Sequence, residues 1–297
     1  MITVPAKNMV FRVKKPNSWF GAEYNMNIYR GCSHGCIYCD SRSDCYGNSD
    51  FDTVKIKDGA LEKIRDDLRR KALKGVVATG AMSDPYNPME RELKLTRNAL
   101  ELLNAFEFGV AIDTKSPLVA RDKHILCDIG EHSPVIVKMT ITTADNDLCG
   151  ILEPGAARTK ERFEALKELS AEGIFCGVLL MPILPFINDT EENILAITRR
   201  AKESGAKFVF PAMGMTLRSG NREYYYEKLD EHFPGMKDKY IRQFGTRYQC
   251  SSIKAKKLWE VFKAECARLG LLSDMHSIIH NYKSGRQGGQ MEWLFCR

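Results

Sequence analysis

The feature that most constrains the fold is an alternation of short apolar runs with amphipathic helical patterns from about residue 75 onward. The apolar runs begin at residues 75, 108, 134, 173 and 206. This spacing is typical of a strand followed by a helix. The runs are almost continuously apolar, as expected for a parallel sheet that is covered on both faces. The intervening patterns predict helices over 88–105, 118–130, 144–150, 159–172 and 190–204.

Local signals support the boundaries of these elements. Asp189 and Glu192 fit a capping box that begins the helix over 190–204. Gly173 and Gly205 stand where helices end and strands begin. Upstream, we expect a first strand over 25–30 and an amphipathic helix over 58–73. Six strand–helix units predict an α/β fold that is an open, partial (β/α)6 TIM-like barrel, with a doubly wound sheet as the alternative.

The pattern also suggests how the chain is divided. We expect an N-terminal segment over 1–24, the partial barrel over 25–215, and a C-terminal extension over 216–297. Residues 221–270 have mostly helical patterns, whereas 274–297 is rich in glycine and is predicted to be irregular. We therefore expect a helical extension that packs on the barrel and does not form an independent domain.

Composition excludes several classes of protein. The chain has 297 residues, of which 44% are hydrophobic and 28% charged, so it is too apolar to be disordered. No stretch approaches the roughly 18 apolar residues of a membrane span, and the first residues lack the apolar core of a signal peptide. We expect a cytoplasmic protein with no membrane association. The net charge of +6 permits a nucleic-acid partner but does not require one.

Ten cysteines are the most informative part of the composition. A cytosolic protein does not keep them as disulfides, so metal binding, catalysis or burial must explain them. Cys32, Cys36 and Cys39 lie on one short loop after the first predicted strand. Three thiolates can hold three corners of a 4Fe-4S cluster and leave one iron open to another ligand. Zinc is the alternative, with His34 or Cys45 as a fourth ligand.

Four motifs give the chain a family resemblance. They are N-x-Y-R-G-C-x-H-G-C-x-Y-C at 27–39, S-D-P-Y-x-P-x-E-R-E-L-x-L-T-R at 83–97, T-K-S-P-L at 114–118 and L-E-P at 152–154. Together they resemble the radical SAM superfamily, its spore-photoproduct-lyase-like subgroup, and within that subgroup the queuine lyases. The resemblance implies a partial barrel with a 4Fe-4S cluster and S-adenosylmethionine (SAM) as cofactors. It also implies reductive cleavage of SAM to a 5′-deoxyadenosyl radical.

The resemblance assigns roles to residues near the predicted strand ends. Cys32, Cys36 and Cys39 resemble the cluster ligands, and Tyr38 the aromatic residue that packs on the adenine. The remaining SAM contacts that the resemblance implies are Ser83 and Asp84 for the amino group, Lys115 and Thr140 for the carboxylate or ribose, Arg158 or Arg162 for the carboxylate, and residues 182–184 with Ala212 and Met213 for the adenine.

Two departures from the subgroup narrow the reaction. Asp40 follows the last cluster cysteine where the spore-lesion enzymes have a second tyrosine, and residues 75–90 contain no cysteine to return hydrogen. We therefore expect a lyase for a small nucleobase-like substrate and not a DNA repair enzyme. The first candidate reaction is queuine to 7-aminomethyl-7-deazaguanine, with Asp113, Glu223 and Tyr224 as candidate substrate contacts.

Other functions remain open from the sequence. The implied partners are a small-molecule substrate and an external electron donor of the flavodoxin or ferredoxin type. The same chemistry on DNA or tRNA is one alternative, and it would require a basic groove at the mouth of the barrel. A non-catalytic iron–sulfur or zinc protein is another, although the SAM motifs beyond the cysteines favour an enzyme.

Overall fold

A curved sheet of seven strands forms the centre of the molecule. The computed structural model describes residues 2–16, 18–47 and 50–284. Six strands are parallel, and among the described residues they follow the order β10-β9-β8-β7-β6-β3, with β2 (Val10–Arg12) antiparallel at the β3 edge. The parallel strands are β3 (Tyr24–Met26), β6 (Val76–Thr79), β7 (Gly109–Thr114), β8 (Val135–Thr140), β9 (Cys176–Leu180) and β10 (Phe208–Pro211). Because β10 does not pair with β2 in this order, the predicted open barrel of six parallel strands is confirmed.

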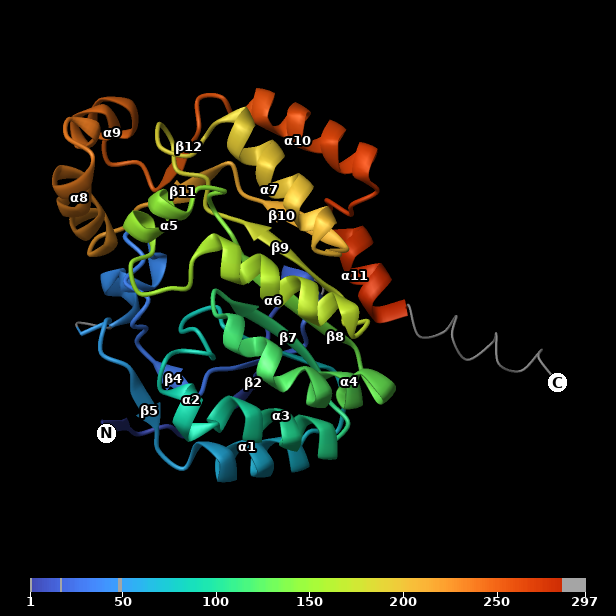
Figure 1. Ribbon diagram of the computed structural model, residues 1–297. Helices are drawn as coiled ribbons and strands as arrows, with labels where there is room; N and C mark the ends of the chain where they lie inside the picture. Colours follow the sequence, from blue (N-terminus) through green and yellow to red (C-terminus); the bar gives the residue numbers. More distant parts are fainter. Residues whose placement is uncertain (1, 17, 48–49, 285–297) are drawn as a thin grey trace.

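Helices cover the outer face of this sheet (Figure 1). They are α1 (Ala60–Arg69), α2 (Glu90–Leu93), α3 (Leu95–Ala105), α4 (Lys123–His132), α5 (Asn146–Leu152), α6 (Thr159–Ala171) and α7 (Glu191–Glu203). Val110 and Met139 pack outward against helix residues such as Leu126. Ala111 and Ile136, which alternate with them along the strands, pack in a separate core inside the barrel. Burial on both faces explains why the strands are continuously apolar.

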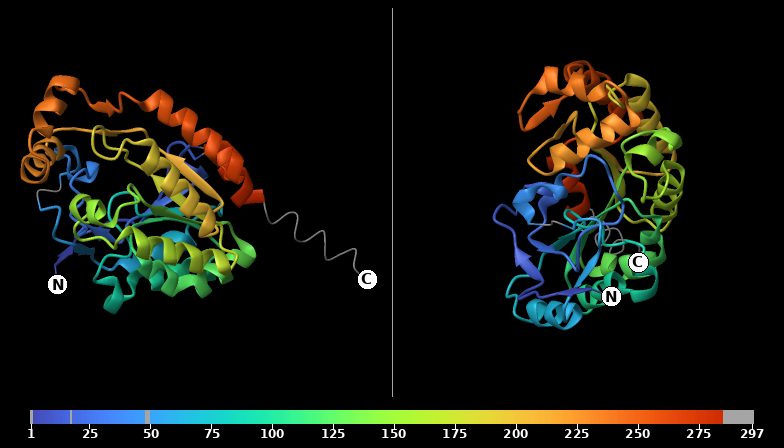
Figure 2. Two further views of the ribbon diagram at one scale, coloured as in Figure 1. Left: turned by 45° about the horizontal axis from the view of Figure 1, so that its top comes forward. Right: turned by 90° about the vertical axis from the view of Figure 1, so that its left-hand side faces the viewer.

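The interior of the barrel is filled from both ends of the chain. Phe20 of the short 3-10 helix η1 (Trp19–Gly21) and Ile278 of α11 (Met275–Ser284) belong to the same buried cluster. Tyr282 also donates a hydrogen bond of 2.5 Å to the carbonyl of Phe20. Figure 2 shows α11 against the sheet at the end of the described chain. The prediction of irregular structure over 274–297 is therefore wrong for α11, and residues 285–297 lie outside the described part.

The other elements after the barrel lie near its open end and beside α7. They are α8 (Asn221–His232), α9 (Met236–Phe244), α10 (Ala255–Leu269) and the antiparallel strands β11 (Gly214–Thr216) and β12 (Gln249–Ser251). Helix α10 packs along α7, where Arg199 pairs with Glu265 at 2.6 Å. Tyr225 and Tyr240 of α8 and α9 share a second core with Ile37 and Tyr38 of the cysteine loop. The division at residue 215 stays a prediction.

Three local expectations differ from the structure. The predicted strand over 25–30 is split into β3 and β4 (Tyr29–Arg30), which joins a small sheet with β5 (Lys55–Lys57) and β1 (Thr3–Val4). The helix over 88–105 is broken at Lys94, whose φ is +50°. The third difference lies at the start of α7.

The predicted capping box at Asp189 and Glu192 is wrong. Thr190 is the N-cap of α7, and its hydroxyl accepts a hydrogen bond of 3.1 Å from the amide of Asn193. Asp189 instead accepts bonds from the amide of Phe186 at 2.8 Å and the hydroxyl of Ser252 at 2.5 Å. Its carboxylate therefore joins the loop after β9 to the C-terminal elements. In the described residues, no helix is long and apolar enough to cross a bilayer.

Candidate active site

The ends of the parallel strands surround a cavity of about 620 Å³. A cavity of this size is in the range of small-molecule sites. The carboxyl ends of parallel strands are also where barrel enzymes carry their reactive groups. The loop or residue after each strand contributes, as shown by the lining residues Tyr38 to Ser41, Gly80, Lys115, Thr140, Met181, Pro182 and Met213.

The three predicted cluster ligands line a smaller cavity of about 90 Å³ that shares residues with the first. Cys32, Cys36 and Cys39 are all present there as free thiols. Burial raises the pKa of the Cys32 thiol to about 11. Without a bound cation, such a thiol stays protonated and neutral. A metal cluster would supply the positive charge that a buried thiolate requires, so the donor set fits a thiolate-bound group.

A cluster and a single zinc ion require different arrangements of donors. Among the residues that the structure describes, no three His, Cys, Asp or Glu side chains converge closely enough to hold one metal ion. A tetrahedral zinc site needs such convergence, whereas a cubane spreads its cysteines over different irons. Cys45 is exposed and contacts Arg218, and His34 lies 3.5 Å from the carboxylate of Asp84. Of the two candidate fourth ligands, His34 thus shares the cavity of the three cysteines, whereas Cys45 does not line it.

Glycines and backbone bonds shape the cysteine loop. Gly31 has a φ of +81°, and a Cβ there would lie 2.3 Å from the carbonyl oxygen of Thr53. Next to it, the amide of Cys32 donates a 2.8 Å bond to Phe51. From the other side, the amide of Ile37 donates to the carbonyl of Leu152 at 3.0 Å. The loop is thus held between the segment that follows it and the L-E-P turn after α5.

A buried ion pair lies behind this loop. Glu153 and Arg162 are both fully buried and contact one another through Oε2 and Nη2, and the hydroxyl of Tyr38 donates to the same carboxylate. Burial alone would raise the pKa of Glu153, but the charges of Arg162 and Lys115 outweigh it and hold the pKa below its ordinary value. Glu153 lies in the L-E-P motif, but the sequence analysis assigns it no role. Arg162 appears there only as the alternative to Arg158 for binding the SAM carboxylate.

Ser83 and Asp84, the expected contacts of the SAM amino group, line the smaller cavity, but both also form hydrogen bonds within the protein. The hydroxyl of Ser83 donates to the carbonyl of Gly31. One oxygen of Asp84 accepts a 2.7 Å bond from Thr114, and the other a 2.7 Å bond from the amide of Lys115. Asp84 therefore joins the ends of β6 and β7, which is a structural task that the sequence did not predict.

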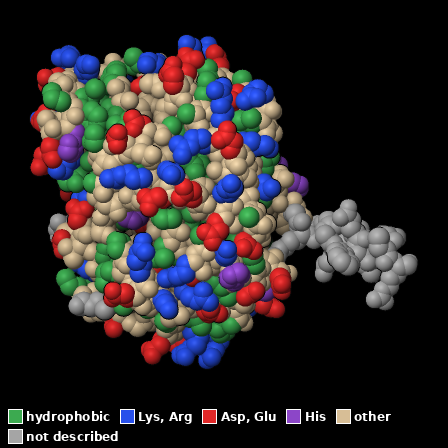
Figure 3. Space-filling model, viewed as in Figure 1, with side chains coloured by type: hydrophobic (Ala, Val, Ile, Leu, Met, Phe, Trp, Pro, Cys, Tyr) green, Lys and Arg blue, Asp and Glu red, His purple; other side chains and the backbone are tan. Residues whose placement is uncertain are grey.

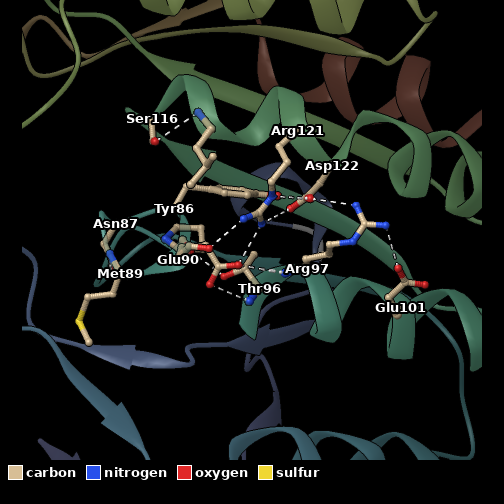
Figure 4. A network of polar contacts seen from close by, with 12 residues as sticks. Tyr86, Asn87, Met89, Glu90, Thr96, Arg97, Glu101, Ser116, Arg121 and Asp122 are labelled. Atoms are coloured by element: carbon tan, nitrogen blue, oxygen red, sulfur yellow. Dashed lines mark hydrogen bonds and ion pairs between the residues drawn. The ribbon is translucent and has the colours of Figure 1, made fainter. Parts of the chain in front are cut away.

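Other residues of the 83–97 motif form a polar network with Arg121 and Asp122 (Figure 4). The fully buried Glu90 accepts bonds from the amide of Thr96 at 3.0 Å and from Arg121 at 3.0 Å. Arg121 also pairs with Asp122 at 2.7 Å, and Arg97 reaches the same aspartate at 3.3 Å. These residues lie away from both cavities and fix the loop after β6 to the turn after β7.

The predicted SAM contacts divide into two groups. Tyr38, Lys115, Thr140 and Met213 line the main cavity. Burial would lower the pKa of Lys115, but nearby negative charges, among them the carboxylate of Glu153, outweigh burial and raise that pKa above its ordinary value. Arg158 lines neither cavity, because it is the exposed N-cap residue of α6. The structure thus separates Arg158 from the other predicted contacts.

The predicted substrate contacts divide in the same way. Asp113 lines both cavities. Glu223 is exposed and accepts a 2.6 Å bond from the amide of Gly220, so it caps α8. Tyr224 stacks on Arg42, whose guanidinium carbon lies 3.9 Å from the ring centre. Neither Glu223 nor Tyr224 lines either of the two cavities, because Glu223 caps α8 and the ring of Tyr224 covers Arg42, so the structure does not support these two predicted contacts.

Sequence reasoning missed the residues at the outer part of the main cavity. Trp19, Gln249, Ser251 and Trp259 contribute to its lining. They come from the N-terminal segment and the C-terminal elements, which the strand–helix repeat does not include. Asp40 lies beside them and accepts a 2.9 Å bond from Thr216 of β11. Asp40, which stands where the subgroup has a second tyrosine, therefore joins the cysteine loop to the C-terminal elements.

Curated relatives cover much of the chain. A protein of Mycobacterium tuberculosis with no assigned function is 30% identical over 224 residues, which are 73% of this chain and 66% of the relative. The chain thus spans slightly less than two thirds of that relative's length. A protein of Methanocaldococcus jannaschii is 33% identical over 64% of this chain and 70% of its own length. The radical SAM Nα-GlyT isomerase of Pseudomonas phage M6 is 22% identical over 89% of this chain and 55% of its own.

Solved structures share the fold. Spore photoproduct lyase in complex with dinucleoside spore photoproduct has a TM-score of 0.68, with 13% identity over 91% of this chain and 80% of that one. The radical SAM methyltransferase TsrM of Kitasatospora setae has a TM-score of 0.54, with 12% identity over 82% of this chain and 51% of that one. At these identities the likeness concerns the fold alone.

The family model of the radical SAM superfamily matches residues 26–198, which include the cysteine loop and every strand from β6 to β9. Two solved structures with this fold contain the expected cofactors: one spore photoproduct lyase structure contains SAM, and one TsrM structure contains a 4Fe-4S cluster. The chain therefore belongs to the radical SAM superfamily, and the prediction of SAM and a 4Fe-4S cluster as its cofactors is confirmed.

Proposed function

We propose that the protein cleaves SAM reductively and uses the resulting radical on a small nucleobase-like substrate. The observation that carries this proposal is the shared boundary of two cavities at the strand ends. Three cysteines line one cavity, and the other has room for a small molecule. When bound, the cluster and SAM supply a carbon radical that abstracts hydrogen from the substrate. The protein's own residues bind, orient and shield the reactants.

Each residue group has a defined part in this proposal. Cys32, Cys36 and Cys39 hold the cluster. Tyr38 offers its ring to the adenine while its hydroxyl is held by Glu153. Lys115 supplies a positive charge for the SAM carboxylate, and its raised pKa keeps the ammonium protonated at neutral pH.

The outer part of the main cavity suits a flat, polar ring. Trp19 and Trp259 supply aromatic surface, and Gln249 and Ser251 supply hydrogen-bonding groups. Asp113 adds a carboxylate that accepts hydrogen bonds from ring N–H groups. Queuine, with release of 7-aminomethyl-7-deazaguanine, is our first candidate among such substrates, and a flavodoxin or ferredoxin is the expected electron donor.

Product analysis tests this proposal. The reconstituted, reduced protein is incubated without oxygen with SAM and queuine, and 5′-deoxyadenosine and all deazaguanine products are measured by mass spectrometry. We expect 5′-deoxyadenosine together with 7-aminomethyl-7-deazaguanine. 5′-Deoxyadenosine with queuine unchanged would reject this substrate, and a product of unchanged mass but altered retention would indicate isomerisation instead of cleavage. Absence of 5′-deoxyadenosine with every substrate would reject the reaction class.

An oligonucleotide substrate is the second candidate. Tyr248 is 44% exposed and stacks with Arg218, whose guanidinium carbon lies 4.6 Å from the ring centre. It precedes Gln249, which lines the cavity. On the face shown in Figure 3, however, Lys and Arg are intermixed with Asp and Glu. A steep loss of oligonucleotide binding between 50 and 200 mM salt would favour this candidate over a free base.

A further inference from the structure

Two charged residues on neighbouring strands, Lys138 and Asp113, form an ion pair at the main cavity, and the proposed function gives no role to the lysine. Lys138 and Asp113 are direct partners in the register of β8 and β7, so their side chains point to the same face of the sheet. Lys138 Nζ lies 2.7 Å from Asp113 Oδ1. The lysine side chain is completely buried, whereas the aspartate keeps 12% of its side chain exposed and lines both cavities.

The surroundings of Lys138 leave Asp113 as its main electrostatic partner. Its Nζ lies 4.5 Å from the ring centre of Phe20, which is itself fully buried. Within the described part of the chain, neither Lys138 Nζ nor Asp113 Oδ1 has an aligned hydrogen bond. A buried ion is strongly unfavourable without a partner of opposite charge. The buried ammonium therefore requires the carboxylate as its partner, and this pairing fixes the position of the Asp113 carboxylate next to the cavity.

A carboxylate that is paired with an ammonium has a specific chemical preference. It can only accept hydrogen bonds, whereas a protonated carboxyl or an amide can also donate one. We propose that Lys138 is a positioning residue that holds the buried Oδ1 of Asp113 and leaves Oδ2 to accept a hydrogen bond in the cavity, and that Asp113 thereby selects a planar heterocycle with an exocyclic amino donor. This inference rests on the proposed function and names the substrate edge that the site recognises.

The test compares two ligands that differ by one donor. 7-Deazaguanine and 7-deazahypoxanthine are identical except for the exocyclic amino group. Binding to the reconstituted, SAM-loaded protein is measured by quenching of tryptophan fluorescence, because Trp19 and Trp259 line the cavity. We expect wild type to bind 7-deazaguanine about tenfold or more tightly than 7-deazahypoxanthine, as for a hydrogen bond to a charged group.

Variants then assign this selectivity to the pair. Asp113→Asn and Lys138→Met are each expected to bring the affinity ratio close to one. Lys207→Met is the matched control, because Lys207 is exposed, and it should retain the wild-type ratio. A variant that is only less stable keeps the affinity ratio, because a smaller folded fraction of protein weakens the apparent binding of both ligands equally. Lys138→Met leaves the Asp113 carboxylate without its partner and can fail to fold for that reason. The double variant Asp113→Asn, Lys138→Met removes this unpaired charge, and we expect its affinity ratio to be near one.

Three results would overturn the inference. They are a wild-type ratio near one, a tenfold ratio that survives in the lysine variant or the double variant, and an Asp113→Asn protein that loses SAM affinity but keeps its ratio. The same wild-type sample is assayed for 5′-deoxyadenosine. Formation of 5′-deoxyadenosine with a ratio near one rejects only the inference, whereas its absence rejects the proposed function.

Discussion

The hydroxyl of Tyr38 donates a hydrogen bond to the carboxylate of Glu153, which lies 115 positions farther along the chain. The same carboxylate pairs with Arg162 at full burial. The residue between two proposed cluster ligands is thereby fixed to the turn after α5. The cysteine loop thus takes its position from the fourth strand–helix unit as well as from its own sequence.

Glu153→Gln should destabilise the protein by about 3–5 kcal/mol, because it leaves Arg162 buried without its opposite charge. The free energy of unfolding of the apoprotein, measured by chemical denaturation, checks this value. Glu164→Gln is the matched control, since Glu164 is an exposed residue of α6 that, within the described part of the chain, pairs only with Lys160 at 3.9 Å. The control should change stability by no more than about 0.5 kcal/mol. Equal effects of the two substitutions would contradict the importance of the buried pair.

We propose that residues 216–297 form an extension that is integral to the barrel, and α11 provides the test. Ile278→Ala should cost about 2–5 kcal/mol, because Ile278 is fully buried in the barrel interior. Ile253→Ala changes the same atoms at a site that is 62% exposed and should cost little. A single unfolding transition with the predicted loss supports one domain. A wild-type protein that unfolds in two separate transitions would contradict it.

Glu265 should make stability depend on pH on the acid side. Its hydrogen bonds with Arg268 and Arg199 lower the pKa of Glu265 from 4.5 to about 2 in the folded protein. A lowered folded-state pKa adds stability above the unfolded-state value, and this stability is lost as the pH falls from about 4.5 toward 2. The stability difference between wild type and Glu265→Gln should therefore shrink as denaturation is repeated from pH 5.5 to pH 3. A constant difference would refute this contribution.

Trp259 should matter for the substrate and not for SAM cleavage. Trp259→Ala removes aromatic surface from the outer part of the cavity, and we expect binding of the 7-deazapurine probe to weaken about tenfold. Trp259→Phe keeps a flat ring and should recover most of the affinity, as measured by calorimetry. Formation of 5′-deoxyadenosine in the absence of substrate should be unchanged in both variants. Loss of that activity in Trp259→Ala would place Trp259 beside the cofactor instead.

The sequence predicted the barrel well because its signals are local. The six parallel strands have buried outer and inner faces, and glycines such as Gly173 and Gly205 end the helices with φ near +77°. The missed edge strand β2 and the break at Lys94 have weak local signals. Helix α11 was missed although Ile278 and Tyr282 are spaced for one helical face, because the neighbouring glycines suggested an irregular segment.

The candidate site was predictable only where function and strand position coincide. Lys115 and Thr140 follow directly from the ends of β7 and β8. Glu223 was misplaced because a carboxylate after the barrel looks the same in sequence whether it caps a helix or faces a cavity. Trp19 and Trp259 were missed because they are 240 positions apart in the sequence. Only the folded chain brings both to the lining of the main cavity. Contacts of this kind have no local signal.

The central claim is that Cys32, Cys36 and Cys39 hold a cluster that serves SAM cleavage. The most direct measurement is 5′-deoxyadenosine formed per iron-reconstituted protein after reduction, for wild type, Cys36→Ala and Cys45→Ala. Cys45 is the matched control because it is exposed and lines neither cavity. We predict that wild type and Cys45→Ala form 5′-deoxyadenosine, whereas Cys36→Ala loses the iron-dependent absorbance and the product together. Undiminished product from Cys36→Ala, or none from wild type, would contradict the account.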